Sequence, residues 1–182
     1  RWVDTEVVPV VDELEHNDIF PDDLVAGLRK LGLFELMIPE EFGGIGASYT
    51  TYSTVVEELA RGWMSLGGIL NTHVIVTHLV STFGTDDQKA RYLPQLSTAE
   101  RRGALTITEP NAGSDFQAIQ SRAVRNGNDY VVNGSKTWCT MGGVGDVVTV
   151  FAKTDPEVAH KGISAFLVPR DSRGLEAGMK TS

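Results

Sequence analysis

The spacing of the apolar residues changes near residue 102, and this change limits the chain to few folds. Before it, apolar side chains recur every three or four positions, as on one face of an α-helix. After it, they alternate with polar side chains, as in β-strands. No long helical segment separates the later strands, which argues against a Rossmann domain. We therefore predict an α+β protein, with an all-helical domain (1–102) followed by an antiparallel β-barrel or β-sandwich (103–182).

Helical patterns occur in several segments of the first half. They cover residues 1–17, the stretch from Pro21 to Gly32, residues 49–63, residues 66–83, and a last segment from Thr85 to about Arg102. Pro9 is expected to interrupt the first helix, because proline cannot donate the helical hydrogen bond. Thr85 and Gln88 have the form of a capping box, which indicates the start of the last helix, and Pro94 is expected to bend it.

Residues 66–83 are apolar on nearly all sides, which predicts a helix buried by neighbours on several sides. At 18 residues, with Asn71, His73 and His78 inside it, the segment is not expected to span a membrane. The two histidines are five positions apart and do not share a helix face, so we expect no metal site. They are expected to be satisfied by hydrogen bonds or to face a ligand.

Charge and cysteine content exclude several classes of protein. The formal net charge is −8, and the basic residues are scattered except for Arg101 and Arg102, which argues against a nucleic-acid partner. The single cysteine, Cys139, excludes an intramolecular disulfide framework. Because it follows Trp138 in an apolar run, it is interpreted as a packed thiol rather than a nucleophile.

The first residues and the apolar runs of the chain bear on where the protein is expected to be found. The first six residues lack the layout of a signal peptide, and no apolar run reaches the ~20 residues of a membrane span, so a cytoplasmic protein is expected. The chain begins without methionine and ends at Ser182 without a closing element. We therefore expect a piece of a larger protein, with a truncated β domain.

Turn signals divide the second half into short strands. The pairs Asn126-Gly127 and Asn133-Gly134 are typical of turns, and the first stands between two β-rich runs, a strong hairpin signal. The β-rich runs expected around and after these turns are residues 121–125, 130–132, 136–140, 146–153 and 163–168. Short strands joined by turns predict the barrel or sandwich.

The stretch Leu105–Asp115 lies at the change of spacing. Two threonines and an asparagine precede the small pair Gly113-Ser114, so the backbone could pass close to a flat polar ligand and turn its N–H groups toward a phosphate. Threonines that alternate with apolar residues are also typical of an ordinary strand, and the following residues of an ordinary loop. Taken alone, the residues favour this structural interpretation.

Three motifs together resemble those of a known family. Residues 108–115, Thr-Glu-Pro-Asn-Ala-Gly-Ser-Asp, are similar to the T-E-P-x-A-G-S-D signature of the flavin-dependent acyl-CoA dehydrogenases. Residues 31–44 and 133–140 also resemble the family's motifs, in its order and at about its spacings. The resemblance covers nearly the whole chain, but the family's pattern continues where this chain stops.

The resemblance implies a reaction and a domain plan. Family members remove a proton from Cα of an acyl-CoA thioester and pass a hydride from Cβ to FAD, which gives the trans-2-enoyl-CoA. Their fold is an N-terminal helical domain, a middle β domain and a C-terminal four-helix domain, and the last is expected to be absent here. The general base is a glutamate of that domain, so no residue of this chain is assigned as catalytic. Glu109 is interpreted as structural.

The resemblance also implies which residues bind FAD. Thr108 would meet the edge of the isoalloxazine ring, Trp138 would cover the ring, and the Thr140 hydroxyl would approach N5, where fixed donors stabilise the charge that arrives with the hydride. Ser114 would bind a phosphate-containing ligand, and is also assigned to substrate binding. The implied cofactor residues are Leu105, Thr106, Ile107, Thr108, Gly113, Ser114, Trp138, Cys139 and Thr140. For Trp138, the alternative is core packing in a sheet.

One departure from the family's pattern affects the second segment. The family usually has Trp-Ile-Thr-Asn where this chain has Trp138-Cys139-Thr140-Met141, so the hydrogen bonds beyond Thr140 are not carried over. Two other functions stay open: a flavin oxidase or monooxygenase on the same scaffold, and a non-catalytic module that binds acyl-CoA or flavin. Expected partners of the full-length protein are acyl-CoA, an electron-transfer flavoprotein or similar acceptor, and further copies in a homodimer or homotetramer. The expected setting is fatty acid β-oxidation, in the bacterial cytosol or the mitochondrial matrix.

Overall fold

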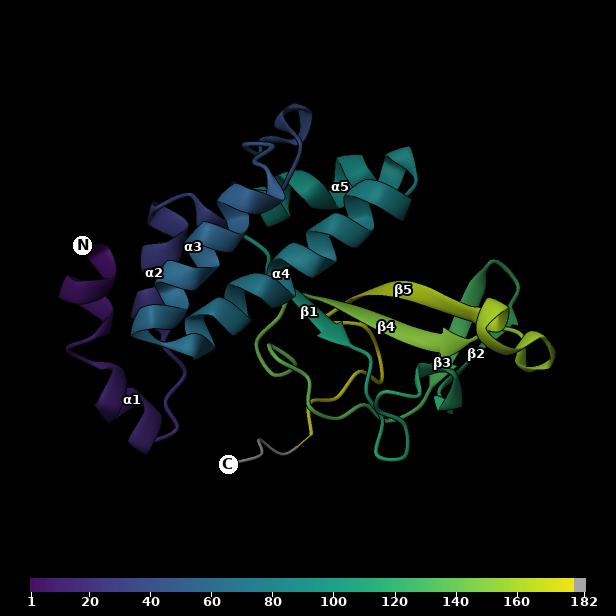
Figure 1. Ribbon diagram of the computed structural model, residues 1–182. Helices are drawn as coiled ribbons and strands as arrows, with labels where there is room; N and C mark the ends of the chain where they lie inside the picture. Colours follow the sequence, from purple (N-terminus) through teal and green to yellow (C-terminus); the bar gives the residue numbers. More distant parts are fainter. Residues whose placement is uncertain (179–182) are drawn as a thin grey trace. The chain divides into compact units, whose positions relative to one another are not determined.

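The computed structural model describes residues 1–178, which divide into two compact units, Arg1–Arg102 and Gly103–Gly178 (Figure 1). The first unit is helical and the second is built on a β-sheet, so the predicted order of helices and then strands is confirmed. The division falls where the apolar spacing changes. The last four positions of the predicted β domain lie outside the described residues.

The helical unit contains five α-helices and a short π-helix. They are the π-helix Val3–Val7, α1 (Val11–His16), α2 (Asp22–Lys30), α3 (Tyr49–Gly62), α4 (Met64–Phe83) and α5 (Asp86–Ser97). Pro9 separates the first two, as predicted. The capping box is present at α5, where the Gln88 N–H donates to the Thr85 hydroxyl and the Thr85 N–H donates to the Gln88 side chain. Each contact satisfies a backbone or side-chain group that a helix start leaves free.

Helix α4 forms the centre of this unit, because it packs against both α3 and α5 (Figure 1). Leu66, Leu70 and Val76 on α4 have no exposed surface. The helix has 20 residues and a mean hydropathy of 1.2 over its most apolar window, so by length and composition alone it could cross a membrane. However, 56% of that window is buried inside the structure, and a core helix passes the same test. The absence of a membrane span therefore stays a prediction.

His73 is a buried core histidine. Its Nε2 donates to the Leu96 carbonyl oxygen at 3.0 Å, and its ring meets Phe34 edge-on, with ring centroids 4.9 Å apart. Burial lowers the pKa of His73 to about 4, although the hydrogen bond to Leu96 favours the protonated form. The expectation of a satisfied polar group is confirmed for this residue.

We predict that His73 makes the helical unit sensitive to mild acid. In the unfolded chain the imidazole takes a proton near pH 6.5, whereas in the folded chain it does so only near pH 4. Unfolding therefore takes up a proton between these values, and the free energy of unfolding should fall by on the order of 3 kcal/mol as the pH drops from 6.5 to 4. Urea unfolding at several pH values measures this slope. In His73→Gln it should be shallower, and His16→Gln on the exposed surface is the control; equal slopes in all three proteins would contradict the prediction.

The second unit is a five-stranded mixed sheet. Its strands are β1 (Gly103–Thr106), β2 (Arg122–Asn126), β3 (Asp129–Asn133), β4 (Val147–Lys153) and β5 (Ile163–Pro169). β4 is central: β5 pairs with it in antiparallel fashion along its whole length, and β1 pairs with it in parallel, with Gly103 opposite Val147. β2 and β3 form a hairpin that joins β4 through one parallel pair, Arg122 opposite Lys153.

The prediction of a purely antiparallel sheet is therefore wrong in its strand directions. Parallel pairing needs a crossover of a dozen residues or more between the strands. Between β1 and β4 the chain supplies such a crossover as two long loops, the first with a short 3-10 helix (Phe116–Ala118), and the β2–β3 hairpin, rather than as an α-helix. Periodicity alone does not show which strands pair, so this arrangement was not visible in the sequence.

Two details of the turns also differ. The hairpin turn consists of Gly127 and Asn128, one position later than predicted, because Asn126 stays in β2 opposite Asp129. Gly127 has φ of +63°, the left-handed conformation that such two-residue turns require. No strand follows directly after Asn133: residues 134–146 form a loop with a turn, and the expected β-rich run 136–140 lies within it.

Candidate functional site

The two segments predicted to contact a cofactor lie against each other in the β unit. The first leaves the end of β1, and the second is the loop between β3 and β4. The Thr137 N–H donates to the Thr108 carbonyl at 2.9 Å, and the Lys136 ammonium donates to the Ile107 carbonyl at 3.1 Å. Residues 29 positions apart in the chain are thus in direct contact.

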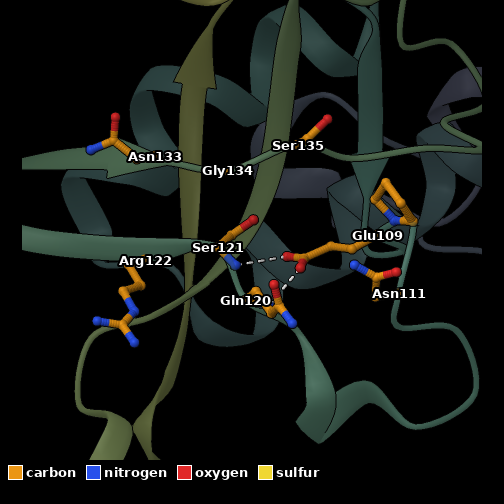
Figure 2. Close-up of a pocket in the computed structure, with 9 residues that line it drawn as sticks. Glu109, Asn111, Gln120, Ser121, Arg122, Asn133, Gly134 and Ser135 are labelled. Carbon is orange, nitrogen blue, oxygen red and sulfur yellow. Dashed lines mark hydrogen bonds between the residues drawn. The ribbon is translucent and has the colours of Figure 1, made fainter.

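Glu109 and Lys136 form a buried ion pair beside these contacts. Lys136 Nζ lies 2.8 Å from Glu109 Oε1, and the two side chains are only 10% and 6% exposed. The Glu109 carboxylate also accepts hydrogen bonds from the backbone N–H groups of Gln120 and Ser121, drawn as dashed lines in Figure 2. One carboxylate therefore joins three loop segments. The structural interpretation of Glu109 is supported by these bonds.

The surroundings of Glu109 keep it ionised. Burial raises the pKa of the carboxyl, but the hydrogen bond from Lys136 and those from the backbone N–H groups outweigh this and lower the pKa to about 2. A carboxylate with so low a pKa, whose oxygens already accept hydrogen bonds from three donors, is a weak base. Glu109 is therefore unsuited to act as a general base.

Glycine at position 134 allows the β3–β4 loop to reach this ion pair. A Cβ atom at Gly134 would lie 2.0 Å from the Ser121 hydroxyl oxygen and 2.8 Å from the Ser121 Cα atom, so any other residue would push the loop away. The sequence suggested only a turn at Asn133-Gly134. Its second purpose, a close approach of two backbones, depends on a contact between distant positions.

Trp138 is exposed in a strained backbone conformation. Its side chain is 76% exposed, and its φ is +54°, a value that residues other than glycine rarely adopt. Core packing of Trp138 in a sheet, the alternative considered from the sequence, is therefore wrong. Strained residues persist where the surrounding structure holds them, and they are frequent at ligand sites. Met141, three positions on, has φ of +64°.

The other predicted cofactor residues differ in what they offer a ligand. Thr106 is buried and its hydroxyl donates to the Thr149 carbonyl at 2.9 Å, so its side chain is not directed at a ligand. Leu105, Ile107, Thr108 and Cys139 are half-buried, whereas Gly113, Ser114 and Thr140 are exposed.

Cys139 behaves as a packed thiol, as expected. Its Sγ donates to the Thr137 carbonyl at 3.3 Å, and burial raises the pKa of the thiol despite the opposing effect of the Lys136 charge. A thiol with a raised pKa is a poor nucleophile near neutral pH.

Gly113 faces open space. A Cβ atom built there would meet no heavy atom within 4 Å, and the φ of Gly113 is not in the left-handed region. The described residues therefore leave room for another molecule at this point. Ser114 follows immediately and is exposed.

A pocket of about 450 Å³ lies next to Glu109. It is lined by residues 109–111, 120–122 and 133–135, and Figure 2 shows the Glu109 side chain directed toward Gln120 and Ser121. None of the predicted cofactor residues lines it. Among residues 1–178, no group of three or more His, Cys, Asp and Glu side chains is placed to hold a metal ion.

The sequence missed the partnership of Glu109 with Lys136. Both residues stand inside the motifs that were singled out, but they are 27 positions apart in loops. No periodicity links two loop residues, so the only available signal was the presence of one acid and one lysine in the two motifs.

Two family models match the chain. The model described as "Acyl-CoA dehydrogenase, N-terminal domain" matches residues 1–100, and the model described as "Acyl-CoA dehydrogenase, middle domain" matches residues 104–182. Among curated relatives, an acyl-CoA dehydrogenase of Bacillus subtilis is 36% identical over 176 residues, which are 96% of this chain and 46% of the relative. A short-chain specific acyl-CoA dehydrogenase of Clostridium acetobutylicum is 38% identical over 98% of this chain and 47% of its own. The chain spans about half the length of these relatives.

Solved structures agree with the sequence comparisons. A glutaryl-coenzyme A dehydrogenase in complex with glutaryl-CoA has a TM-score of 0.90 at 37% identity, over 95% of this chain and 45% of that chain. A glutaryl-CoA dehydrogenase of Mycobacterium smegmatis in complex with FADH2 has a TM-score of 0.87 at 30% identity, over 95% of this chain and 44% of that chain. With the matching motifs, the helical and β units and the family models in agreement, the chain belongs to the acyl-CoA dehydrogenase family.

Proposed function

We propose that this chain is the N-terminal helical domain (1–102) and middle β domain (103–182) of a FAD-dependent dehydrogenase that converts an acyl-CoA thioester to the trans-2-enoyl-CoA. The observation that carries the proposal is the contact between the two predicted cofactor segments, with Trp138 held exposed beside them. The glutaryl-CoA and FADH2 complexes of related proteins support the choice of substrate class and cofactor.

The residues present fit FAD. The Trp138 ring is 76% exposed, so a second flat ring could stack on it without first displacing other side chains. Room beside Gly113 and the exposed hydroxyl of Ser114 suit a phosphate-bearing ligand. FAD, when bound, would supply the acceptor for the hydride that leaves Cβ of the thioester.

This chain's own residues would bind FAD and acyl-CoA and orient them. Trp138 would cover the flavin ring, the Thr140 hydroxyl would donate a hydrogen bond toward N5, and the backbone at Ile107 and Thr108 would meet the ring edge. Ser114 would contact FAD or acyl-CoA phosphate. The general base is proposed to be a glutamate in a C-terminal helical domain outside residues 1–182, since the low pKa of Glu109 makes it a weak base and its oxygens already accept three hydrogen bonds.

The setting of the whole protein is also part of the proposal. We propose a homodimer or homotetramer that acts in the cytosol or mitochondrial matrix, within fatty acid β-oxidation, and passes its electrons to an electron-transfer flavoprotein or a similar acceptor. Transfer to oxygen instead would indicate the flavin oxidase or monooxygenase alternative. Reoxidation of the reduced protein in air and under argon separates these functions.

Thr140→Ala tests the role of the second segment in the whole protein. The variant should slow flavin reduction by about 10²-fold, because a donor aimed at developing charge is lost, while the Kd of the acyl-CoA changes by less than about threefold. Stopped-flow absorbance with a panel of straight-chain acyl-CoA thioesters measures both. Thr140→Ser keeps the hydroxyl and is the matched control. Equal losses in rate and binding, or an unchanged rate, would count against the role.

A further inference from the structure

The ion pair of Glu109 and Lys136 joins loops that no sheet ladder connects. Lys136 Nζ contacts Glu109 Oε1 at 2.8 Å and the Ile107 carbonyl at 3.1 Å, and the Ser121 N–H donates to the same carboxylate oxygen at 3.0 Å. Both side chains are nearly fully buried. These contacts tie the segment after β1, the segment before β2 and the β3–β4 loop to one point.

Trp138, with its strained backbone conformation, lies two positions after Lys136 in the chain. Upstream, the chain is fixed by Lys136 and by the Thr137 N–H bond to the Thr108 carbonyl. Downstream, the Gly145 N–H donates to the Met141 carbonyl at 2.7 Å. Backbone conformations of this kind persist only where the surroundings over-determine them, and here the ion pair supplies one of the two upstream restraints.

A buried ion pair is a poor means of gaining stability, because both charges lose their hydration. Such a pair instead provides geometric specificity, because a charged donor and a charged acceptor bond well in only a few relative positions, whereas apolar side chains of similar size can pack in many. The Glu109–Lys136 pair links the two cofactor segments. It is buried, whereas the Trp138 ring and the Ser114 and Thr140 side chains, which are proposed to touch a ligand, are exposed. It is therefore suited to fix distances rather than to touch a ligand.

We propose that Glu109 and Lys136 are positioning residues, which set Trp138 and Thr140 at a fixed distance from the Ile107–Thr108 backbone. The inference rests on the proposed function, in which these two segments contact FAD. Without the pair, the β3–β4 loop loses one of its two anchors, and the remaining Thr137–Thr108 bond should open more often. A displacement of about 1 Å at a reacting centre can lower a rate by about 10²-fold.

The test uses the whole protein and four variants. Lys136→Met and Glu109→Gln remove one charge each, Lys136→Arg keeps the charge, and Arg125→Met removes an exposed cation of the same unit that donates to the Gly127 carbonyl. In Lys136→Met and Glu109→Gln the flavin should be reduced about 100-fold more slowly by acyl-CoA, with the Kd within about threefold and an altered visible flavin spectrum. Lys136→Arg should stay within about tenfold of the wild type, and Arg125→Met should match it.

A second readout needs neither substrate nor reduction. In Lys136→Met the amide hydrogen exchange of Thr137, Gln120 and Ser121 should accelerate by a factor at least ten times larger than any acceleration in the centre of β4. Hydrogen exchange can also be measured in a variant that has lost its flavin. Unchanged exchange, or an unchanged spectrum and rate in both charge-removing variants, would overturn the positioning role. A wild-type protein that binds no FAD would overturn the proposed function instead, and the exchange data would still decide whether the pair orders the loop.

Discussion

Residues 1–182 purified alone are expected to be colourless and to reduce no electron acceptor with any acyl-CoA, whereas the whole protein is expected to be yellow and active. In the proposed function the described residues offer only one side of the cofactor site, because Trp138, Ser114 and Thr140 are exposed. Interactions that must hold a flavin there act in water, where they are weak. The proposed general base is also outside these residues, and general acid–base help is worth roughly 10² to 10⁴-fold.

The measurement is the ratio of absorbance near the flavin band to protein absorbance, followed by dye reduction with a panel of acyl-CoA thioesters. Added FAD should be removed from residues 1–182 by gel filtration but retained by the whole protein. Sedimentation should show that residues 1–182 form no stable oligomer, since the family resemblance places subunit assembly in the C-terminal domain. Stoichiometric FAD on residues 1–182, measurable turnover, or a stable tetramer would contradict this prediction.

Local signals in the sequence predicted the helical unit well. A capping box spans four residues and a helix stripe repeats within a few turns, so both can be read without knowing the fold. Thr85 and Gln88 form the predicted box, and α3 begins and ends within one residue of the predicted 49–63. α4 begins two residues earlier than predicted, because Met64 and Ser65 continue the helix beyond its apolar stretch.

Contacts between distant positions limited the prediction of the β unit. The parallel pairing of Ala104 with Val148 follows from the path of the chain through two loops and a hairpin, and no local pattern specifies that path. The turn at Gly127 was displaced by one position for a smaller reason, since both Asn-Gly and Gly-Asn suit a two-residue turn.

In the candidate site, too, some features could be predicted from the sequence and others depended on contacts between distant positions. The family resemblance placed Thr108 and Trp138 in neighbouring segments, and the Thr137–Thr108 hydrogen bond joins those segments. It did not indicate that the Thr106 hydroxyl turns into the sheet, because alternation along a strand gives the two faces without saying which one is buried. Their contacts with FAD stay predictions.

Lys136→Met should destabilise the β unit by about 3 to 5 kcal/mol near neutral pH. The substitution leaves the Glu109 carboxylate, 6% exposed in the native protein, without its cation, and an uncompensated buried charge costs about this much. Native-state hydrogen exchange in β4 (Val147–Lys153) measures the opening of this unit separately from the helical unit. Arg61→Met, in the helical unit, removes exposed ion pairs with Glu58 and Asp4 and is expected to cause no measurable change in β4.

The pH dependence separates a lost ion pair from a simple packing defect. In the wild type the folded Glu109 has a pKa of about 2, below the 4.5 of the unfolded chain, so its contribution to stability is present above pH 4.5 and is lost as the pH falls toward 2. In Lys136→Met the carboxyl loses its strongest favourable bond while burial still raises its pKa, so it takes up a proton at higher pH and the buried charge disappears. The stability difference between the two proteins should therefore shrink as the pH is lowered from 7 to 4. Glu109→Gln/Lys136→Met, which has no buried charge, should recover part of the loss at pH 7 and show no such pH dependence. A difference that stays constant with pH would mean that Lys136 stabilises the loop through its methylene groups rather than through its charge.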